Sequence, residues 1–177
     1  MAEAHSNEIE ALLAQRYPGV QIQKKSVVQS LWSGYGQILR LHLGPKGISA
    51  PNTVVVKLVK PPQGDSGISH ERKCNSYVVE QFFYETCAAR LDPQHCRVPT
   101  LLCSGQRQQS GETLFVLEDL DAQEAGFGGR RHSLSLKDAQ ACVVWLAHFH
   151  RTFLSTKGKS TPEGLWEQVR ETGVGRR

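Results

Sequence analysis

The sequence predicts an α+β fold, an antiparallel sheet with a helical appendage. Short apolar or alternating segments occur in pairs, separated by turn-forming residues, as in strands joined by hairpins. Two longer segments have apolar residues at helical spacing, and they interrupt and follow the strand-like segments. The coarse order is helix, three strands, helix, two strands, connector and helix, which differs from the regular alternation of parallel α/β folds.

Composition limits the class of protein. The 177 residues suffice for one domain or for one domain and part of a second, and 39% hydrophobic with 21% charged residues is typical of a globular chain. The net charge of +4 permits an anionic ligand. The basic residues are scattered, without interleaved aromatic residues, so we expect no nucleic-acid partner.

Cysteine usage and hydropathy bear on the compartment. The five cysteines include no C-x-x-C pair, and the acidic N-terminal stretch does not resemble a signal peptide. No apolar run approaches membrane-spanning length. We therefore expect a reduced, cytoplasmic protein without a membrane partner.

The first half of the chain begins with a short helix. Asn7 is a candidate cap, Ile9, Leu12 and Leu13 are its apolar positions, and a Pro-Gly pair ends it. Strands are then expected in "SVVQSL" and "QILRLHL", on either side of "WSGYG", and in "TVVVKLVK" after the loop "GPKGISAPN".

The second half begins with a helix predicted from about residue 69 to residue 90. Two strands, "VPTLLCSG" and "ETLFVLEDL", follow it and are joined by "QRQQSG". After a glycine-rich connector, Ser135 and Asp138 form a capping-box pattern that opens the helix "LKDAQACVVWLAHFHRTFL". The expected organisation is a lobe over 1–121, a connector over 122–131, a long helix within 132–156 and a disordered tail over 157–177.

Lys57 stands out because it lies in the middle of an apolar strand, after three valines and before Leu58 and Val59. Burying an ammonium group is costly unless it finds a partner. Two interpretations follow. Lys57 lies on an exposed edge strand, where lysine is common, or it reaches inward to an anionic group.

A carboxylate occupies a comparable position on the predicted helix. Helical spacing places Glu80 on one face with Phe83, Tyr84, Cys87 and Leu91. Opposite charges on two core-facing surfaces suggest an ion pair, whose disruption typically costs roughly 3–5 kcal/mol. The alternative is that both side chains extend along their stems to the surface.

Four segments in order resemble one family. "VVVKL", "VVEQFFYE", "VPTLLCSG" and "LFVLEDLD" are similar to the N-terminal lobe of the choline-kinase-like and ecdysteroid-kinase-like phosphotransferases, relatives of aminoglycoside phosphotransferases with a protein-kinase-like fold. The pattern E-x-x-F-Y and the segment E-D-L are the most specific parts. The helix ending "WLAHFH" resembles the first large helix of the C-terminal lobe, so the resemblance covers most of residues 20–166.

The resemblance implies an ATP site with a lobe of about five antiparallel strands and one main helix. Lys57 would hold the α- and β-phosphates, and Glu80 would orient it. Glu118 to Leu120 would meet the adenine edge through backbone groups. Gly34 and Gly36 would form the turn over the phosphates, although Leu39 departs from the full G-x-G-x-x-G pattern and a plain hairpin turn is an alternative.

The sequence lacks the motifs that would complete catalysis. Members of this family use MgATP, with H-G-D-x-x-x-x-N and a later acidic motif supplying the catalytic base and the metal ligands. Here the last aspartate is Asp138 and the last asparagine is Asn75, and "HFH" lacks the adjacent aspartate. We expect a truncated form that does not transfer a phosphoryl group by itself, with no catalytic or metal-binding residue assigned. The acceptor of the full-length relatives could be choline-like, steroid-like or aminoglycoside-like.

A second hypothesis is a non-catalytic regulatory or interaction fragment. In a truncated chain the apolar face of the last helix would be uncovered and would favour association or aggregation. We expect His150 on this face to be a core histidine. The face comprises Cys142, Val143, Leu146, Phe149 and Phe153.

Overall fold

The computed structural model describes residues 2–45, 49–64, 66–107, 112–122 and 133–154. The chain divides into two compact units. The first contains Met1–Gly67 and Pro99–Ala125, and the second contains Ile68–Val98 and Gly126–Arg177. Three α-helices and one five-stranded antiparallel sheet make up the regular structure of the described residues, so the predicted α+β class is confirmed.

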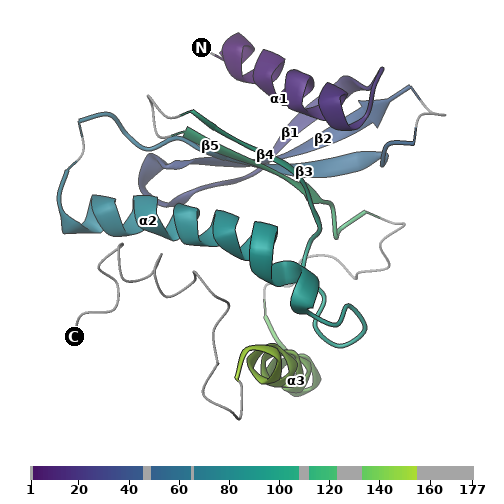
Figure 1. The fold of residues 1–177 in the computed structure, drawn as a ribbon, viewed down its shortest axis with the longest axis vertical. Coiled ribbons are helices and arrows are strands. Elements are labelled where there is room, and N and C mark those ends of the chain that lie inside the picture. Colours follow the sequence, from purple (N-terminus) through teal and green to yellow (C-terminus); the bar gives the residue numbers. More distant parts are fainter. Residues whose placement is uncertain (1, 46–48, 65, 108–111, 123–132, 155–177) are drawn as a thin grey trace. The chain divides into compact units, whose positions relative to one another are not determined.

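The first unit is built on the sheet (Figure 1). Its strand order is β1-β2-β3-β5-β4, and every neighbouring pair is antiparallel. β3 is therefore the central strand, with β2 on one side and β5 on the other. The strands are β1 (Gln21–Ser30), β2 (Gly36–Gly44), β3 (Thr53–Val59), β4 (Leu101–Arg107) and β5 (Glu112–Glu118).

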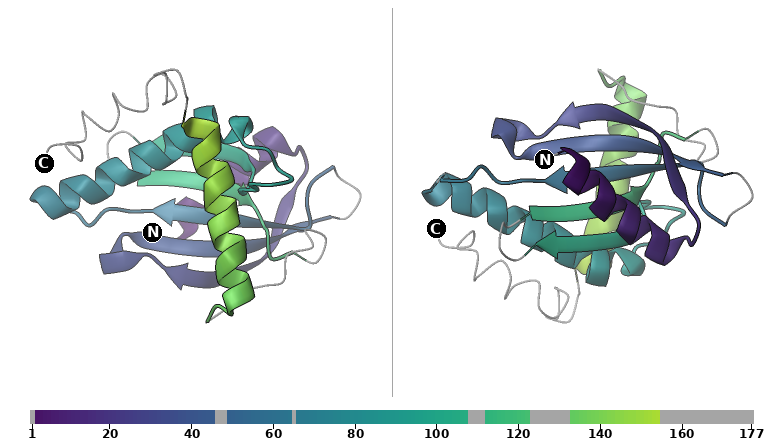
Figure 2. Two further views of the ribbon diagram at one scale, coloured as in Figure 1. Left: turned by 90° about the horizontal axis from the view of Figure 1, so that it is seen from below. Right: turned by 90° about the horizontal axis from the view of Figure 1, so that it is seen from above.

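Helix α1 (Ala2–Arg16) covers one face of this sheet (Figures 1 and 2). Ile9 and Leu13 are fully buried in a cluster with the alternate residues of the strands, which include Leu41 and Val56. The expected cap at Asn7 is wrong, because the helix begins at Ala2. Alanine and glutamate are strong helix formers, and they extend the helix toward the N-terminus before Asn7.

The second unit contains α2 (Ile68–Phe82) and α3 (Leu136–Phe153). The expected single helix over 69–90 starts within one residue of α2, but its α-helical part ends at Phe82. A π-helical turn (Phe83–Cys87) and a 3₁₀ turn (Ala88–Arg90) follow. The wider π turn changes the rotation per residue, so Leu91 does not continue the helical face of Glu80.

Helix α3 opens with the predicted capping box. The hydroxyl of Ser135 accepts the N–H of Asp138 at 3.2 Å, and the Asp138 carboxylate accepts the N–H of Ser135 at 3.1 Å. On one side of α3, the indole N–H of Trp145 donates to the carbonyl of Arg97 at 3.1 Å, and the rings of Phe149 and Phe83 lie 6.0 Å apart.

On the opposite side of α3, no described element of the second unit packs against the apolar residues. Val143, Val144 and Leu146 are 65%, 57% and 45% exposed. Cys142 and His150 are also exposed, so the expectation of a core histidine at His150 is wrong. His150 shares the uncovered side with Val143 and Leu146, and an apolar neighbour does not bury a residue unless another element packs on that side.

Of the expected connector over 122–131 only Ala122 is described, and the expected tail over 157–177 lies outside the described residues. The expected disordered tail therefore stays a prediction, as does the lobe boundary at residue 121. Among the described residues, no helix is long and apolar enough to cross a membrane.

Candidate nucleotide site

Lys57 lies in the centre of the sheet. It pairs with Ile38 of β2 and with Phe115 of β5, so both backbone edges of its strand are occupied. The edge-strand interpretation of this lysine is therefore excluded. Along β3, Val54, Val56 and Leu58 point to the core under α1, and Lys57 points to the opposite face because strand side chains alternate.

The environment of Lys57 is half-buried and partly aromatic. Its Nζ lies 5.9 Å from the ring centroid of Phe115, within the range of a cation–π interaction. Phe115 is fully buried, so it forms a rigid support for the lysine stem. The ammonium group of Lys57 therefore lies on the face of the sheet opposite the one that α1 covers.

Glu80 belongs to the second unit, on α2. It is half-buried, and its charge acts on two phenols one turn away in either direction. Burial raises the pKa of Tyr77 and of Tyr84, and the Glu80 carboxylate raises both further. Because Lys57 and Glu80 lie in different units, their ion pair stays a prediction.

Gly34 and Gly36 lie in the connection between β1 and β2. Trp32–Gly34 forms a 3₁₀ turn, and β2 begins at Gly36 opposite Val59, the last residue of β3. The turn therefore lies beside the C-terminal end of β3, and that end is two residues beyond Lys57. It is a tight hairpin connection, which is compatible with either interpretation of these glycines.

The two glycines are favoured at their positions for different steric reasons. Gly36 has a φ of +127°, and a Cβ at this position would meet the carbonyl oxygen of Leu58 at 2.0 Å. Gly34 has a φ of +75° but open space around it. Gly36 is therefore required for the close approach of β2 to β3. Gly34 is favoured only by its backbone conformation.

Glu118 ends β5 and connects it to β4. Its N–H donates to the carbonyl of Thr100 at 2.9 Å, and its carboxylate accepts the hydroxyl of Thr100 at 3.0 Å. Glu118 pairs with Val54 at the start of β3. The segment from Glu118 to Leu120 and the Gly34–Gly36 turn therefore lie toward opposite ends of β3, with Lys57 between them.

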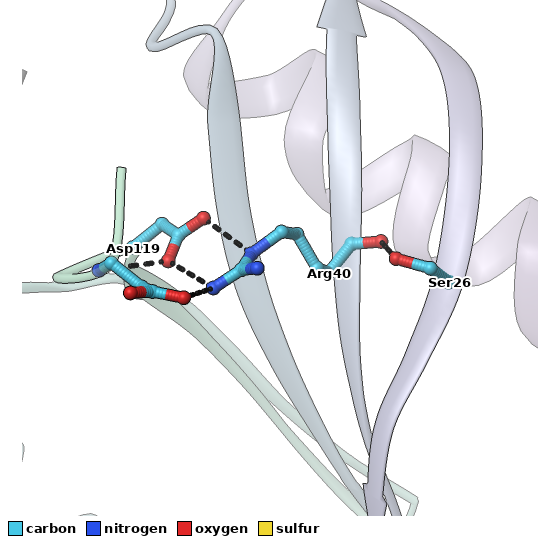
Figure 3. A network of polar contacts seen from close by, with 4 residues as sticks. Ser26, Arg40 and Asp119 are labelled. Carbon is cyan, nitrogen blue, oxygen red and sulfur yellow. Dashed lines mark hydrogen bonds and ion pairs between the residues drawn. The ribbon is translucent and has the colours of Figure 1, made fainter. Parts of the chain in front are cut away.

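A network that the sequence analysis missed fixes the segment after β5 (Figure 3). The guanidinium of Arg40 on β2 donates two hydrogen bonds to Asp119, at 2.8 and 3.1 Å, and a third to Asp121 at 2.8 Å. Asp119 is 4% exposed, so it is a buried carboxylate with a bidentate partner. Both carboxylates raise the pKa of Arg40, Asp119 more than Asp121.

This network holds Leu120 between two anchored aspartates. The Asp119 carboxylate also accepts the N–H of Asp121 at 3.2 Å, which closes the turn on itself. The only sequence signal was the alternation of "QILRLHL", which puts Arg40 on the face opposite Leu39 and Leu41. This alternation predicts the face of the strand on which Arg40 lies, but it cannot predict a hydrogen-bond partner 79 residues away.

Metal ligands are the part of the family's site that has no counterpart among the described residues. No group of three histidine, cysteine, aspartate or glutamate side chains in this part of the chain is placed to share a metal ion. Asp119 and Asp121 instead share ion pairs with the single guanidinium of Arg40.

The fold and the site define an α+β protein whose five-stranded antiparallel sheet carries a central lysine. Comparison of the sequence with protein-family models and with curated proteins gives no match. The kinase-like family therefore remains a resemblance carried by short motifs.

Proposed function

We propose that the chain is the nucleotide-binding lobe of a small-molecule hydroxyl kinase of the choline-kinase-like, ecdysteroid-kinase-like and aminoglycoside-phosphotransferase-like type. The observation that carries the proposal is the position of Lys57 on the third, central strand, between a glycine turn and the segment that follows β5. Kinases of this fold place their phosphate-binding lysine on the third strand and its carboxylate partner on the next helix. Glu80 occupies that helix here.

In this proposal Lys57 binds the α- and β-phosphates, and Glu80 orients it. The turn with Gly34 and Gly36 covers the phosphates. The backbone of Glu118 to Leu120 meets the adenine edge, in a geometry fixed by Arg40. Bound ATP would bring its phosphates next to a half-buried cation that already has a buried aromatic support.

Residues 1–177 bind the nucleotide in this proposal but do not transfer its γ-phosphoryl group alone. Transfer needs a carboxylate near the acceptor hydroxyl and two ligands for Mg²⁺. The sequence after Asp138 contains only Glu163, Glu167 and Glu171 as carboxylic side chains. In this proposal the acceptor site and the catalytic base are not among residues 1–177.

Thermal unfolding with and without nucleotide tests this proposal. ATP at a hundred times its dissociation constant should stabilise the folded chain by about 2.7 kcal/mol, which is a shift of several degrees. Lys57→Met should remove the shift. Lys25→Met is the matched control, since it removes the same charge from an exposed position on β1 and should leave the shift unchanged.

Two results would contradict the proposal. One is the absence of any shift at millimolar ATP in a chain that unfolds cooperatively. The other is an equal shift in the wild type and in Lys57→Met, since this would place the nucleotide away from the central strand.

A second candidate is a protein-interaction fragment, favoured by the uncovered side of α3. Leu136 and Val143 are 78% and 65% exposed. Contiguous exposed apolar side chains typically mark an interaction surface. Self-association measured by sedimentation, and its loss in Val143→Lys with Leu146→Lys, would support this function. A monomer at high concentration, with no change in the double variant, would count against a surface that binds a second copy.

A further inference from the structure

The second unit contains a cavity that the nucleotide proposal does not use. It has a volume of about 360 Å³. One wall comes from the segment after the 3₁₀ turn, and the other comes from the last turns of α3. Its lining residues are Asp92, His95, Cys96, His148, Arg151 and Thr152.

The two histidines of the lining stack on each other. The rings of His95 and His148 lie 4.7 Å apart at an angle of 24°. Nδ1 of His95 lies 2.8 Å from the carboxylate of Asp92, which fixes the orientation of the ring. Because Nδ1 faces the carboxylate, a protonated His95 has Nε2 left as a second donor.

Arg151 and Cys96 complete the electrostatic environment. No hydrogen bond or ion pair joins Arg151 to another described residue, so its five N–H donors remain available to a ligand. Cys96 is 1% exposed, and burial raises the pKa of its thiol. The thiol is therefore neutral and adds no negative charge beside the cations. Thr152 donates its hydroxyl to the carbonyl of His148 at 3.0 Å.

The balance of charge in this cavity favours an anion over a metal ion. Asp92 is the only carboxylate of the lining, and His95 holds it. Against it stand one permanent cation, Arg151, and two imidazoles, each of which offers a ring N–H donor. No three side chains of metal-binding type converge anywhere in the described part of the chain.

We propose that this cavity is a binding site for a small molecule that carries a phosphate group. Three separate donors, on His95, His148 and Arg151, match the three outer oxygens of a phosphate monoester. The volume lies at the lower end of the range of small-molecule sites, so the ligand is compact. All of its lining residues belong to the second unit, whereas Lys57 belongs to the first.

Nuclear magnetic resonance of the histidine rings tests the site. Inorganic phosphate would be titrated into the full chain at about pH 6, where histidine side chains gain protons, and sodium chloride would hold the ionic strength constant. The signals of His95 and His148, identified through His95→Gln and His148→Gln, should shift along saturable curves with one shared dissociation constant. The other five of the seven histidines should not follow that curve.

Arg151→Gln should raise this dissociation constant at least about tenfold, because it removes a charge-assisted donor pair. Arg90→Gln is the control, since the Arg90 guanidinium lies over the Phe153 ring at 5.1 Å and outside the cavity lining. Lys57→Met should not change phosphate binding here, which separates this site from the nucleotide site. Shifts that do not saturate, or equal constants in the wild type and in Arg151→Gln, would overturn the proposal.

Discussion

At the scale of the residue, Arg40 is the side chain on which the segment after β5 most depends. Its side chain is 27% exposed, and it contacts Asp119, whose side chain alone is 2% exposed. Without it, Asp119 would be a buried charge with one remaining backbone donor. Arg40→Met should therefore lower the free energy of unfolding by about 2–4 kcal/mol, somewhat below the full cost of breaking a buried pair because Arg40 is partly exposed.

Urea unfolding of Arg40→Met, Asp119→Asn and the double variant measures this pair. The two losses should not add, since either change alone breaks the same contact. Arg40→Lys keeps the charge but loses the planar fork, and it should recover only part of the loss. Independent, additive effects would mean that Arg40 and Asp119 stabilise the chain through other contacts.

Asp92 gives a prediction about pH. Its hydrogen bond with His95 lowers the pKa of Asp92 below the ordinary value of 3.8, with a smaller effect from the N–H of Gln94. A carboxyl whose pKa is lower in the folded state stabilises that state above pH 3.8, and this contribution is lost as the pH falls through the folded pKa. The carboxyl carbon signal of Asp92 should thus titrate below 3.8 in the native chain.

His95→Gln is the matched variant for that titration. Glutamine removes the imidazole that lowers the pKa and leaves the backbone donor in place, so the Asp92 midpoint should move up toward its ordinary value. An unchanged midpoint would show that the backbone hydrogen bond, rather than the imidazole, holds the pKa of Asp92 down.

At the scale of the element, the β1–β2 turn is fixed by one close approach. A Cβ at Gly36 would overlap the Leu58 carbonyl at 2.0 Å, and the strands would have to separate to admit it. Gly36→Ala should cost at least about 3 kcal/mol, combining backbone strain with a steric clash. Gly34→Ala, where a Cβ meets nothing within 4 Å, should cost only about 1 kcal/mol.

Denaturant unfolding of Gly36→Ala and Gly34→Ala measures the loss of stability caused by each change. Nucleotide affinity measured on the same proteins adds a second readout. If Gly34→Ala keeps its stability but loses ATP affinity, this glycine serves the ligand. Equal stability losses in the two variants would contradict the steric difference derived from the turn.

Local sequence patterns correctly predicted the features that depend on residues close together in the sequence. The capping box at Ser135 and Asp138 is one, since both partners lie within four residues and its geometry is confirmed. The apolar run of β-branched residues around Lys57 correctly indicated a strand. Helix boundaries were less accessible, because neither the start at Ala2 nor the π turn at Phe83 has a distinct local pattern.

At the scale of the whole molecule, the sequence predicted the fold class but not the contacts between distant segments. Its pattern left Lys57 either on an edge or inward, and only the strand order decides that β3 is central. The contact between Arg40 and Asp119 could not be predicted from their positions in the sequence. It depends on the pairing of β2 with β3 and of β3 with β5. His150 was misplaced for a related reason, since its burial depends on whether another element covers that side of α3.

The central claim is that Lys57 binds nucleotide in a position set by Glu80, and a double-mutant cycle on ATP affinity tests it most directly. Isothermal titration of the wild type, Lys57→Met, Glu80→Gln and the double variant gives four dissociation constants. We predict that each single change weakens ATP binding and that the double variant is no weaker than Lys57→Met, because Glu80 acts only through the lysine. Losses that add fully, or ATP affinity that is unchanged in Lys57→Met, would contradict the account.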